Sequence, residues 1–393
     1  MTNSALLSPV EEGAREAYQR YFSRPPRWIA SAPGRVNLIG EYTDYNGGFV
    51  LPMAIEARTA IAAAPNDSSR IVLHSQSVGE TTTIDLSGRV MPEIRGRWTN
   101  YVRGVVAGFL KAGIKLQGFD AVIRSEVPLG AGLSSSAALE TSMATVLESV
   151  TGVTLDPLAK VLLCQSAEHS FAAVPCGIMD PYISSLGREG YAMLLDCRSN
   201  EPTWLPLDDP AVAILVINTN VKHQLSKSEY ALQRKACEAA ARTLDVPSLR
   251  EASMEMLERG SSDLEERAMR CARHVIGEIA RTERAAACIR RRDWTEFGRL
   301  LDASHDSLKV DFQVSCEELD AVVAAARGIG MQGGVYGARL TGGGFGGCVI
   351  ALIEAAKQAE IERAIGAAYL RATGIRATLF VSRPAFGATV IEL

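Results

Sequence analysis

A glycine-rich segment, Pro128–Glu140 (PLGAGLSSSAALE), carries the clearest chemical signal in this chain of 393 residues. It follows Phe119–Ser125, which alternates apolar and polar residues as a half-buried strand does, and it leads into a helix predicted over 134–150. Glycines let backbone N–H groups approach an anion, and a helix N-terminus adds unpaired N–H groups and a positive dipole end. Serines 134–136 could cap the helix and ligate Mg²⁺. The segment therefore predicts a phosphate-binding loop or, as a structural alternative, a capped helix after a tight turn.

Two known nucleotide-binding patterns do not fit the glycine-rich segments. The first segment lacks the Gly-Lys-Ser/Thr that closes a P-loop. Gly342–Gly347 (GGGFGG) formally matches G-x-G-x-x-G, but the residues that follow, Cys348–Ile353, are apolar and β-leaning, whereas a dinucleotide fingerprint opens into a helix. We therefore expect this second loop to lead into a strand, with its glycines serving unusual backbone angles or a close approach by a ligand or another chain segment.

A third segment, Ala32–Gly48 (APGRVNLIGEYTDYNGG), gathers polar side chains among its glycines. Carboxylates accept two or more hydrogen bonds each, so this combination suits the several hydroxyls of a sugar. The alternative is a polar loop with an internal ion pair. The residues concerned are Arg35, Asn37, Glu41, Asp44 and Asn46.

A fourth segment, Ala167–Pro181, places two acids at the boundaries of helices. Glu168 ends one predicted helix, and Asp180 precedes a proline, which is favoured at the first position of a helix. Asp180 is therefore either a helix N-cap or a general base or orienting group near a phosphoryl acceptor. His169, next to Glu168, is interpreted as structural.

The elements that must position these segments divide the chain into two α+β parts. Short β-leaning stretches precede the first long helix, and charged helix formers dominate from Ser226 to about Arg292, where one apolar stripe recurs at helical spacing. A chain of this length exceeds what one hydrophobic core usually serves, so we expect domains at 1–205 and 206–393. Further predicted helices span 10–22, 155–169 and 355–373, and predicted strands span 28–39, 49–55, 60–63, 71–74, 81–86, 191–195, 211–218, 336–340, 348–354 and 377–381.

Composition excludes several classes of protein. A net charge of −4 and a lack of long single-sign runs argue against nucleic acid as a partner. No apolar run approaches the ~20 residues needed to cross a bilayer, and Met1–Arg24 lacks the layout of a secretory signal. The eight cysteines form no CxxC pair and no zinc-like spacing with His. We therefore expect reduced thiols in a cytoplasmic protein, without a membrane partner, and a monomer.

Taken together and in this order, the segments resemble the galactokinase branch of the small-molecule kinase family that includes homoserine and mevalonate kinases. Besides the segments above, RWTNYVRG, SKSEYALQRKAC and ARLTGGGFGGCVIAL are similar to galactokinase motifs, so the resemblance spans about Trp28 to Val381. It implies a two-domain α+β fold, with an N-terminal domain like ribosomal protein S5 domain 2 and a ferredoxin-like C-terminal domain. It also implies transfer of the γ-phosphoryl group of Mg·ATP to the anomeric 1-hydroxyl of D-galactose.

The resemblance carries roles to individual residues. Asp180 matches the catalytic aspartate, acting either as a base or as an orienting group, and Arg35 matches the arginine that pairs with it. Ser136 and Glu168 match the pair that holds Mg²⁺, and Trp98 matches a wall on the adenine side. Contacts to galactose are implied for Glu41, Tyr42, Asp44, Gly177 and Tyr230, and contacts to ATP for Gly130, Ala131, Gly132, Leu133, Ser134, Ser135, Ser136 and Ala137.

Two positions depart from the family pattern. Tyr42 stands where galactokinases usually carry a His that reaches the 6-hydroxyl of the sugar, so we expect altered tolerance at C6. Pro181 replaces a usual Gln. Two alternatives stay open: a 1-kinase for another acceptor, such as L-arabinose, galacturonate or N-acetylgalactosamine, and a non-catalytic regulator that senses sugar and ATP. Regulators of that kind have lost part of the Ser-Ala run of the phosphate loop, which is complete here at 134–138.

Overall fold

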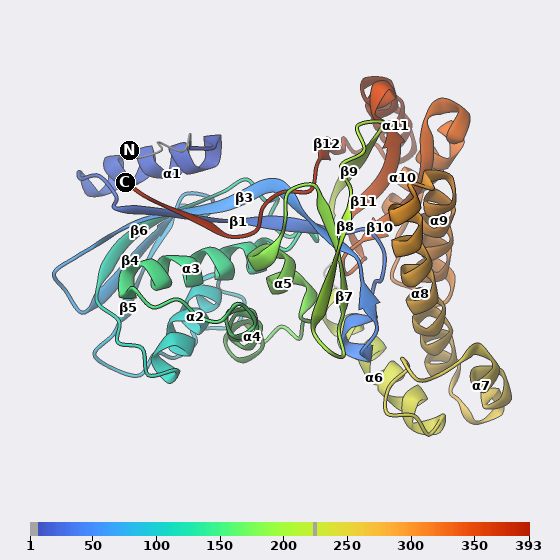
Figure 1. The fold of residues 1–393 in the computed structure, drawn as a ribbon, viewed down its shortest axis with the longest axis horizontal. Helices are drawn as coiled ribbons and strands as arrows, with labels where there is room; N and C mark the ends of the chain where they lie inside the picture. Colours follow the sequence, from blue (N-terminus) through green and yellow to red (C-terminus); the bar gives the residue numbers. More distant parts are fainter. Residues whose placement is uncertain (1–6, 223–225) are drawn as a thin grey trace.

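One half of the structure is built on a six-stranded sheet in the order β13-β1-β3-β6-β4-β5 (Figure 1). The computed structural model describes residues 7–222 and 226–393, so the first six residues of Met1–Arg24 lie outside it. Neighbouring strands are antiparallel except β4 and β6, which run parallel. The strands are β1 (Trp28–Asn37), β3 (Pro52–Pro65), β4 (Arg70–Ser75), β5 (Glu80–Asp85), β6 (Phe119–Ser125) and β13 (Thr389–Glu392).

Helices cover both faces of this sheet because β3 is apolar on both sides. Ala60 and Ala62 pack with the core under α1, while Ile61 and Ala63 pack with the core on the opposite face. One continuous strand therefore replaces part of the two shorter strands expected here. The first face carries α1 (Pro9–Phe22), and the second carries α2 (Thr99–Lys111), α3 (Ser135–Thr151), α4 (Pro157–Ala167) and α5 (Met179–Leu186).

The second half is built on a four-stranded antiparallel sheet in the order β10-β11-β9-β12. Along β9 the apolar residues alternate: Leu215 packs with the core that includes α10 and α11, and Val216 with the core that includes α9. The strands are β9 (Val212–Lys222), β10 (Val335–Thr341), β11 (Gly346–Glu354) and β12 (Thr378–Ser382), and the helices are α6 (Ser226–Thr243), α7 (Met254–Arg259), α8 (Glu266–Arg291), α9 (Trp294–Val310), α10 (Glu317–Ile329) and α11 (Gln358–Thr373).

Shared packing joins the two halves. A small sheet combines β2 (Phe49–Val50), which lies between β1 and β3 in sequence, with β7 (Tyr191–Asp196) and β8 (Glu201–Pro206), which precede the second half. One apolar core combines residues of β1, β9 and α9. The last strand, β13, returns to the first sheet beside β1 (Figure 1). The α+β fold class is confirmed, while the division at residue 205 stays a prediction.

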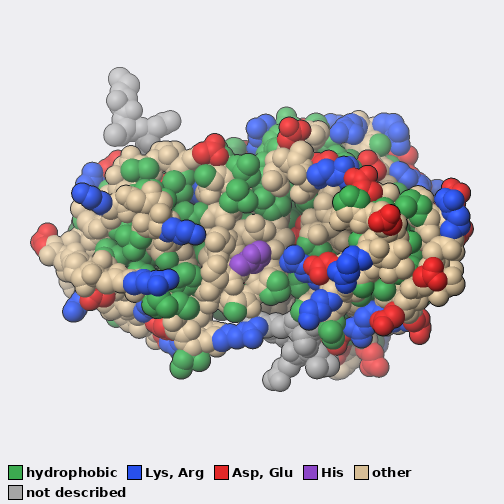
Figure 2. Space-filling model, turned by 90° about the horizontal axis from the view of Figure 1, so that it is seen from below, with side chains coloured by type: hydrophobic (Ala, Val, Ile, Leu, Met, Phe, Trp, Pro, Cys, Tyr) green, Lys and Arg blue, Asp and Glu red, His purple; other side chains and the backbone are tan. Residues whose placement is uncertain are grey.

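On the face shown in Figure 2, basic and acidic side chains are interspersed, and neither sign forms a broad patch. In the described part of the chain, no helix combines the length and the apolar character that crossing a membrane requires.

Candidate active site

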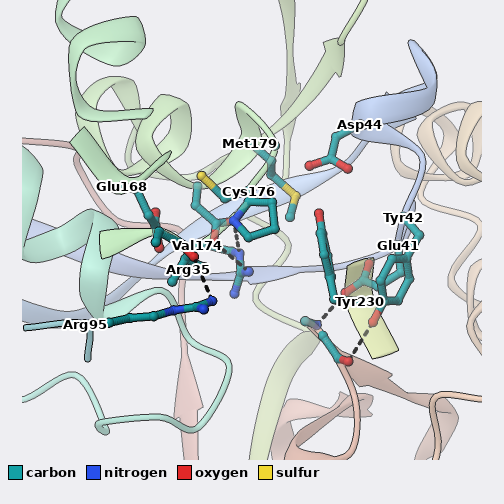
Figure 3. A pocket seen from close by; sticks show the side chains of 16 residues that line it. Arg35, Glu41, Tyr42, Asp44, Arg95, Glu168, Val174, Cys176, Met179 and Tyr230 are labelled. Carbon is teal, nitrogen blue, oxygen red and sulfur yellow. Dashed lines mark hydrogen bonds and ion pairs between the residues drawn. The ribbon is translucent and has the colours of Figure 1, made fainter. Parts of the chain in front are cut away.

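A cavity of about 270 Å³ brings together side chains from segments far apart in the sequence (Figure 3). Of the lining residues that were predicted from the sequence, four come from the polar segment near the start of the chain, three from the helix-boundary segment and one from α6. These eight, all predicted from the sequence, are Arg35, Glu41, Tyr42, Asp44, Glu168, Gly177, Asp180 and Tyr230. The loop Ala173–Cys176, Arg95, Met179, Gly342 and Gly343 complete the lining.

Arg35 and Asp180 form a bidentate ion pair in this cavity. Arg35 Nε donates to Asp180 Oδ1 at 2.8 Å, and Nη2 donates to Oδ2 at 3.0 Å. Arg35 is buried on β1, whereas the Asp180 side chain is 23% exposed and faces the cavity. Paired, parallel hydrogen bonds of this kind fix the orientation of a carboxylate. The Asp180 carboxylate is therefore held in a fixed orientation at the wall of the cavity.

The alternative that Asp180 caps a helix is wrong. Helix α5 begins at Met179 with Ile178 at the cap position, so Asp180 lies in the first turn of the helix. Its carboxylate accepts hydrogen bonds from Arg35 and from Ser134 Oγ instead. Pro181 follows inside the same turn, where its missing N–H leaves no helical hydrogen bond unmade.

The phosphate loop runs from β6 to α3 and is tied to Arg35. Arg35 Nη1 donates to Gly132 O at 2.5 Å, and its backbone N–H donates to Leu133 O at 3.1 Å. The expected serine cap is absent: Ser134 occupies the cap position of α3 with φ +57°, and its hydroxyl reaches Asp180 rather than the helix N–H groups. The first N–H groups of α3 therefore lack a side-chain cap from Ser134 and remain available to an anion.

The second glycine loop packs directly on the phosphate loop. A Cβ atom at Gly342 would lie 2.8 Å from Gly132 O, and one at Gly347 would lie 2.8 Å from Ala131 O. Both glycines also have φ above +80°. These glycines therefore allow backbone angles that other residues rarely adopt, and they leave room for the other chain segment to approach. The loop leads into β11 as expected.

One end of the cavity is formed by Asp44, Gly177 and Tyr230. Burial raises the pKa of Asp44 to about 6, with the charge of Asp180 adding to the effect. Asp44 Oδ1 accepts a hydrogen bond from the Tyr45 N–H, which lowers the pKa again in part. The ring of Tyr230 lies 5.6 Å from that of Tyr42, between ring centroids. Carboxylate and aromatic surface side by side suit a polyhydroxylated ring compound.

A hydrogen bond from its hydroxyl group fixes the side chain of Tyr42. Tyr42 Oη donates to Gly343 O at 2.6 Å, and the ring packs 4.4 Å from that of Phe312. The residue has φ +66°, and its side chain is 6% exposed. The hydroxyl is thus committed to the second glycine loop.

Glu41 is anchored by residues of the C-terminal half. Its Oε1 accepts the Gly342 N–H at 2.6 Å, and its Oε2 accepts from Arg339 Nη1 at 3.1 Å and from Asn37 Nδ2. Burial raises the pKa of Glu41, and the charge of Arg339 opposes that rise. Glu278 accepts the Gly40 N–H at 3.0 Å and so holds the turn before Glu41.

Glu168 is buried and lies near the hydroxyl group of Ser136. It begins the π turn Glu168–Ala172 after α4, and burial followed by the charge of Asp180 raises its pKa to about 7. Hydrogen bonding from Ser136 lowers that pKa again. Glu140, fully buried on α3, has two carboxylate oxygens without a hydrogen-bond partner, and burial raises its pKa well above the usual range.

These oxygens fit a magnesium ion better than a transition metal. Mg²⁺ is usually held by one or two protein oxygens together with substrate phosphates and water. Ser136 and Glu168 could supply such oxygens, because Glu168 lines the cavity and Ser136 lies close enough to its carboxylate to lower the pKa of Glu168. No group of three or more His, Cys, Asp or Glu arranged to hold a metal occurs in the described ranges, so a closed protein cage is absent there.

Trp98 and His169 lie outside the cavity lining. Trp98 Nε1 donates to Glu80 at 2.9 Å, and its ring packs on the core beneath α2. His169 Nε2 lies 2.8 Å from Cys176 O and 3.1 Å from Cys176 N, so it closes the loop before Gly177, in agreement with its structural interpretation.

Sequence reasoning missed the supporting residues Arg339, Glu278 and His274, and the lining residue Arg95. Arg339 stands inside the ARLTGGG motif, where a basic residue next to the glycines was a usable signal. Arg95, Glu278 and His274 carry no local pattern. Only the fold brings them to the cavity or beneath it.

Comparisons with known proteins agree with this geometry. The chain matches the galactokinase galactose-binding signature at residues 16–65, the GHMP kinase N-terminal domain at 100–188 and the GHMP kinase C-terminal domain at 285–371. It is 46% identical to a galactokinase from Homo sapiens over 386 residues (97% of this chain, 96% of the relative) and 46% identical to one from Bos taurus over 385 residues (96% of each).

Solved structures give the same picture. A Lactococcus lactis galactokinase complexed with galactose superposes with a TM-score of 0.90 at 32% identity, covering 96% of this chain and 98% of that one. A mevalonate kinase superposes with a TM-score of 0.64 at 18% identity, covering 90% and 98%, which is a likeness of fold alone. The two-domain kinase fold expected from the sequence is thereby confirmed.

Proposed function

The chain belongs to the galactokinase family and phosphorylates galactose with ATP, and we propose that Arg35 and Asp180 form its reacting centre. Their bidentate ion pair at the cavity wall is the observation that carries this assignment. The 1-hydroxyl oxygen of galactose forms a bond to the γ-phosphorus while the bond from that phosphorus to the bridging oxygen breaks, which leaves ADP. The hydroxyl proton passes to Asp180.

The reaction depends mainly on positioning, because phosphoryl transfer proceeds through a loose transition state. Asp180 orients the attacking hydroxyl, and Arg35 keeps Asp180 ionised and ties it to the phosphate loop through Gly132 O. The acceptor lies at the end of the cavity formed by Glu41, Tyr42, Asp44, Gly177 and Tyr230. The phosphates lie on the loop from Gly130 to Ala137, with the adenine on the Trp98 side.

Ser136 and Glu168 would hold Mg²⁺, and the ion would offset negative charge on the phosphates. Deprotonated Glu168 is the form that would bind the ion. Burial and the charge of Asp180 favour the neutral form of Glu168, so a bound ion and the carboxylate would stabilise each other.

No observation favours the alternatives. The Ser-Ala run at 134–138 is complete, and Arg35 and Asp180 are in contact, so the site has the parts that a non-catalytic regulator lacks. We place the enzyme in a reducing compartment, the cytoplasm, because all eight cysteines are free. The monomeric state stays a prediction.

The test is ADP release from Mg·ATP by purified protein against galactose, N-acetylgalactosamine, L-arabinose, galacturonate, glucose, mevalonate and homoserine. Fast turnover with galactose and little with mevalonate or homoserine is expected. No turnover with any sugar, in protein whose melting temperature rises with ATP or galactose, would overturn the proposal and leave a binding protein.

A further inference from the structure

Arg95 lines the cavity without a carboxylate partner. Among the described residues that form the lining, Arg95 and Arg35 are the two cations, and they face the carboxyl groups of Glu41, Asp44, Glu168 and Asp180. A guanidinium at a cavity wall can pair with an anionic substrate group that enters the cavity, because guanidinium groups bind carboxylates and phosphates in a bidentate manner.

Arg35 cannot supply free positive charge to a substrate. Its Nε and Nη2 are bound to Asp180 and its Nη1 to Gly132 O, so its charge is already offset by the carboxylate beside it. A triphosphate entering this cavity would therefore meet more negative than positive charge unless another cation faced it.

The neighbours of Arg95 hold its segment in place. Arg97 Nη2 pairs with Glu80 at 2.9 Å, and Arg103 Nη2 pairs with Glu93 at 2.7 Å. Arg95 instead makes one hydrogen bond, from Nη2 to Ala173 O at 3.3 Å, and no carboxylate within the described ranges lies within 4.0 Å of it. The anchored segment thus presents one guanidinium with most of its donors unused.

Arg95 lies on the side of the cavity away from the acceptor end. Figure 3 shows Arg95 on the same side as Glu168 and well separated from Asp44, Tyr42 and Tyr230, with Arg35 between the two groups. The contact of Arg95 with Ala173 places it at the end of the π turn that begins with Glu168.

We infer that Arg95 binds the phosphate chain of the nucleotide, at the γ-phosphoryl group that reacts or at the phosphates next to it. This inference rests on the proposed function, because it assigns the side of the cavity near Glu168 to the phosphates. Arg95 adds a planar, bidentate donor to the charge that offsets the phosphates, and it is a specificity-determining residue for nucleotides that carry β- and γ-phosphates.

The test compares Arg95→Gln and Arg95→Lys with Arg89→Gln, a matched control on the same segment whose exposed side chain does not line the cavity. Binding of ATP, ADP, AMP and galactose is measured by calorimetry, together with steady-state kinetics. For Arg95→Gln we expect ATP and ADP to bind about 10- to 100-fold more weakly, the range of one charge-assisted hydrogen bond. Galactose affinity should stay at the wild-type value, and Arg95→Lys should recover part of the loss.

Three results would overturn the inference. ATP affinity in Arg95→Gln equal to that in Arg89→Gln would show that Arg95 makes no phosphate contact. A rise confined to the KM of galactose would place Arg95 at the acceptor, and equal losses for ATP and AMP would indicate a change of the segment rather than of a phosphate contact. Because nucleotide binding is measured directly, the inference can fail or hold even if wild-type protein shows no turnover with galactose.

Discussion

The Asp44 carboxylate fills the space that a Cβ atom on residue 177 would need. Asp44 begins the 3-10 turn Asp44–Asn46, and Gly177 lies in the loop before α5, so two segments far apart in the chain interlock at the acceptor end of the cavity. Gly177 does not have a positive φ, so space rather than backbone conformation requires the glycine.

Gly177→Ala is expected to displace Asp44 and to raise the KM for galactose about 10-fold or more, with a smaller effect on the KM for ATP. Steady-state kinetics with each substrate varied will measure this. Gly88→Ala is the matched control, since a methyl group there meets nothing within 4 Å. Equal galactose KM values in the two variants would contradict the role given to Asp44.

Asp180→Asn should lower kcat by about 10²- to 10⁴-fold, because the amide neither takes up the hydroxyl proton nor keeps both hydrogen bonds to Arg35. Galactose affinity should change only a few-fold. Asp67→Asn, on an exposed loop, serves as the control, and circular dichroism and thermal melting establish that both variants fold. Near wild-type turnover in folded Asp180→Asn would refute the assignment.

Tyr42→His is expected to change the ratio of kcat/KM for galactose to that for L-arabinose, which lacks the C6 group. In the wild type the Tyr42 hydroxyl is committed to Gly343 O, whereas a shorter imidazole would release that carbonyl and open the pocket. Tyr42→Phe separates the two effects, since it keeps the ring and removes the hydrogen bond. Identical sugar ratios in wild type and Tyr42→His would sink the idea that this residue sets C6 tolerance.

Glu168→Gln and Ser136→Ala should each raise the Mg²⁺ concentration needed for half-maximal activity, by about 10-fold for the glutamate. ATP binding measured with and without Mg²⁺ gives a readout independent of turnover: the variants should lose the part of ATP affinity that Mg²⁺ adds. Glu126→Gln, an exposed carboxylate outside the cavity, is the control. Unchanged Mg²⁺ dependence in both variants would remove these residues from the metal site.

The contribution of His274 and His305 to stability should fall as the pH drops from about 6.5 to about 4, whereas the raised pKa values of Asp44 and Glu168 act in the opposite direction. Burial lowers the pKa values of His274 and His305 from 6.5 to about 4, so between these values the unfolded chain binds protons that the folded chain does not. The stabilisation that each histidine contributes is present above pH 6.5 and is lost towards pH 4, at about 1.4 kcal/mol for each pKa unit of the shift.

Denaturant unfolding at pH 4 to 7.5 measures this slope. His274→Gln should reduce this slope by about one bound proton, and His74→Gln, at a half-buried position of β4 whose ring nitrogen lies 2.9 Å from Thr81 Oγ1, is the comparison variant. A slope equal in wild type and His274→Gln would contradict the buried, neutral state of His274, whose ring contacts Ser307 Oγ and Glu41 O.

Much of the site was predictable because its residues lie in short segments with strong local patterns. The strand at 119–125 and the helix after it follow from alternation and glycine punctuation, and both are confirmed. The family resemblance named eight of the residues that line the cavity. Helix-capping patterns gave the wrong role for Ser134 and Asp180. Neither side chain caps its helix, and the Ser134 hydroxyl donates a hydrogen bond to Asp180 instead.

The remaining parts could not be read from the sequence because they depend on contacts between distant segments. Arg339 and Glu278 hold Glu41 and Gly40 from the C-terminal half, and nothing in the local sequence of α8 marks a residue beneath the cavity. Helix α2 and strand β13 were also missed. The four-residue β13 is too short to show a pattern and is fixed by pairing with β1.

The return of β13 to the first sheet has a consequence for synthesis. Ser31 in β1 meets Thr389 in β13, 358 positions later. While the chain is being made on the ribosome, the N-terminal sheet can form its helices and most of its strands, but the outer edge of β1 keeps its hydrogen-bonding groups unpaired until almost the whole chain has emerged. Nascent or prematurely terminated chains would therefore display an open strand edge, the feature through which β proteins aggregate.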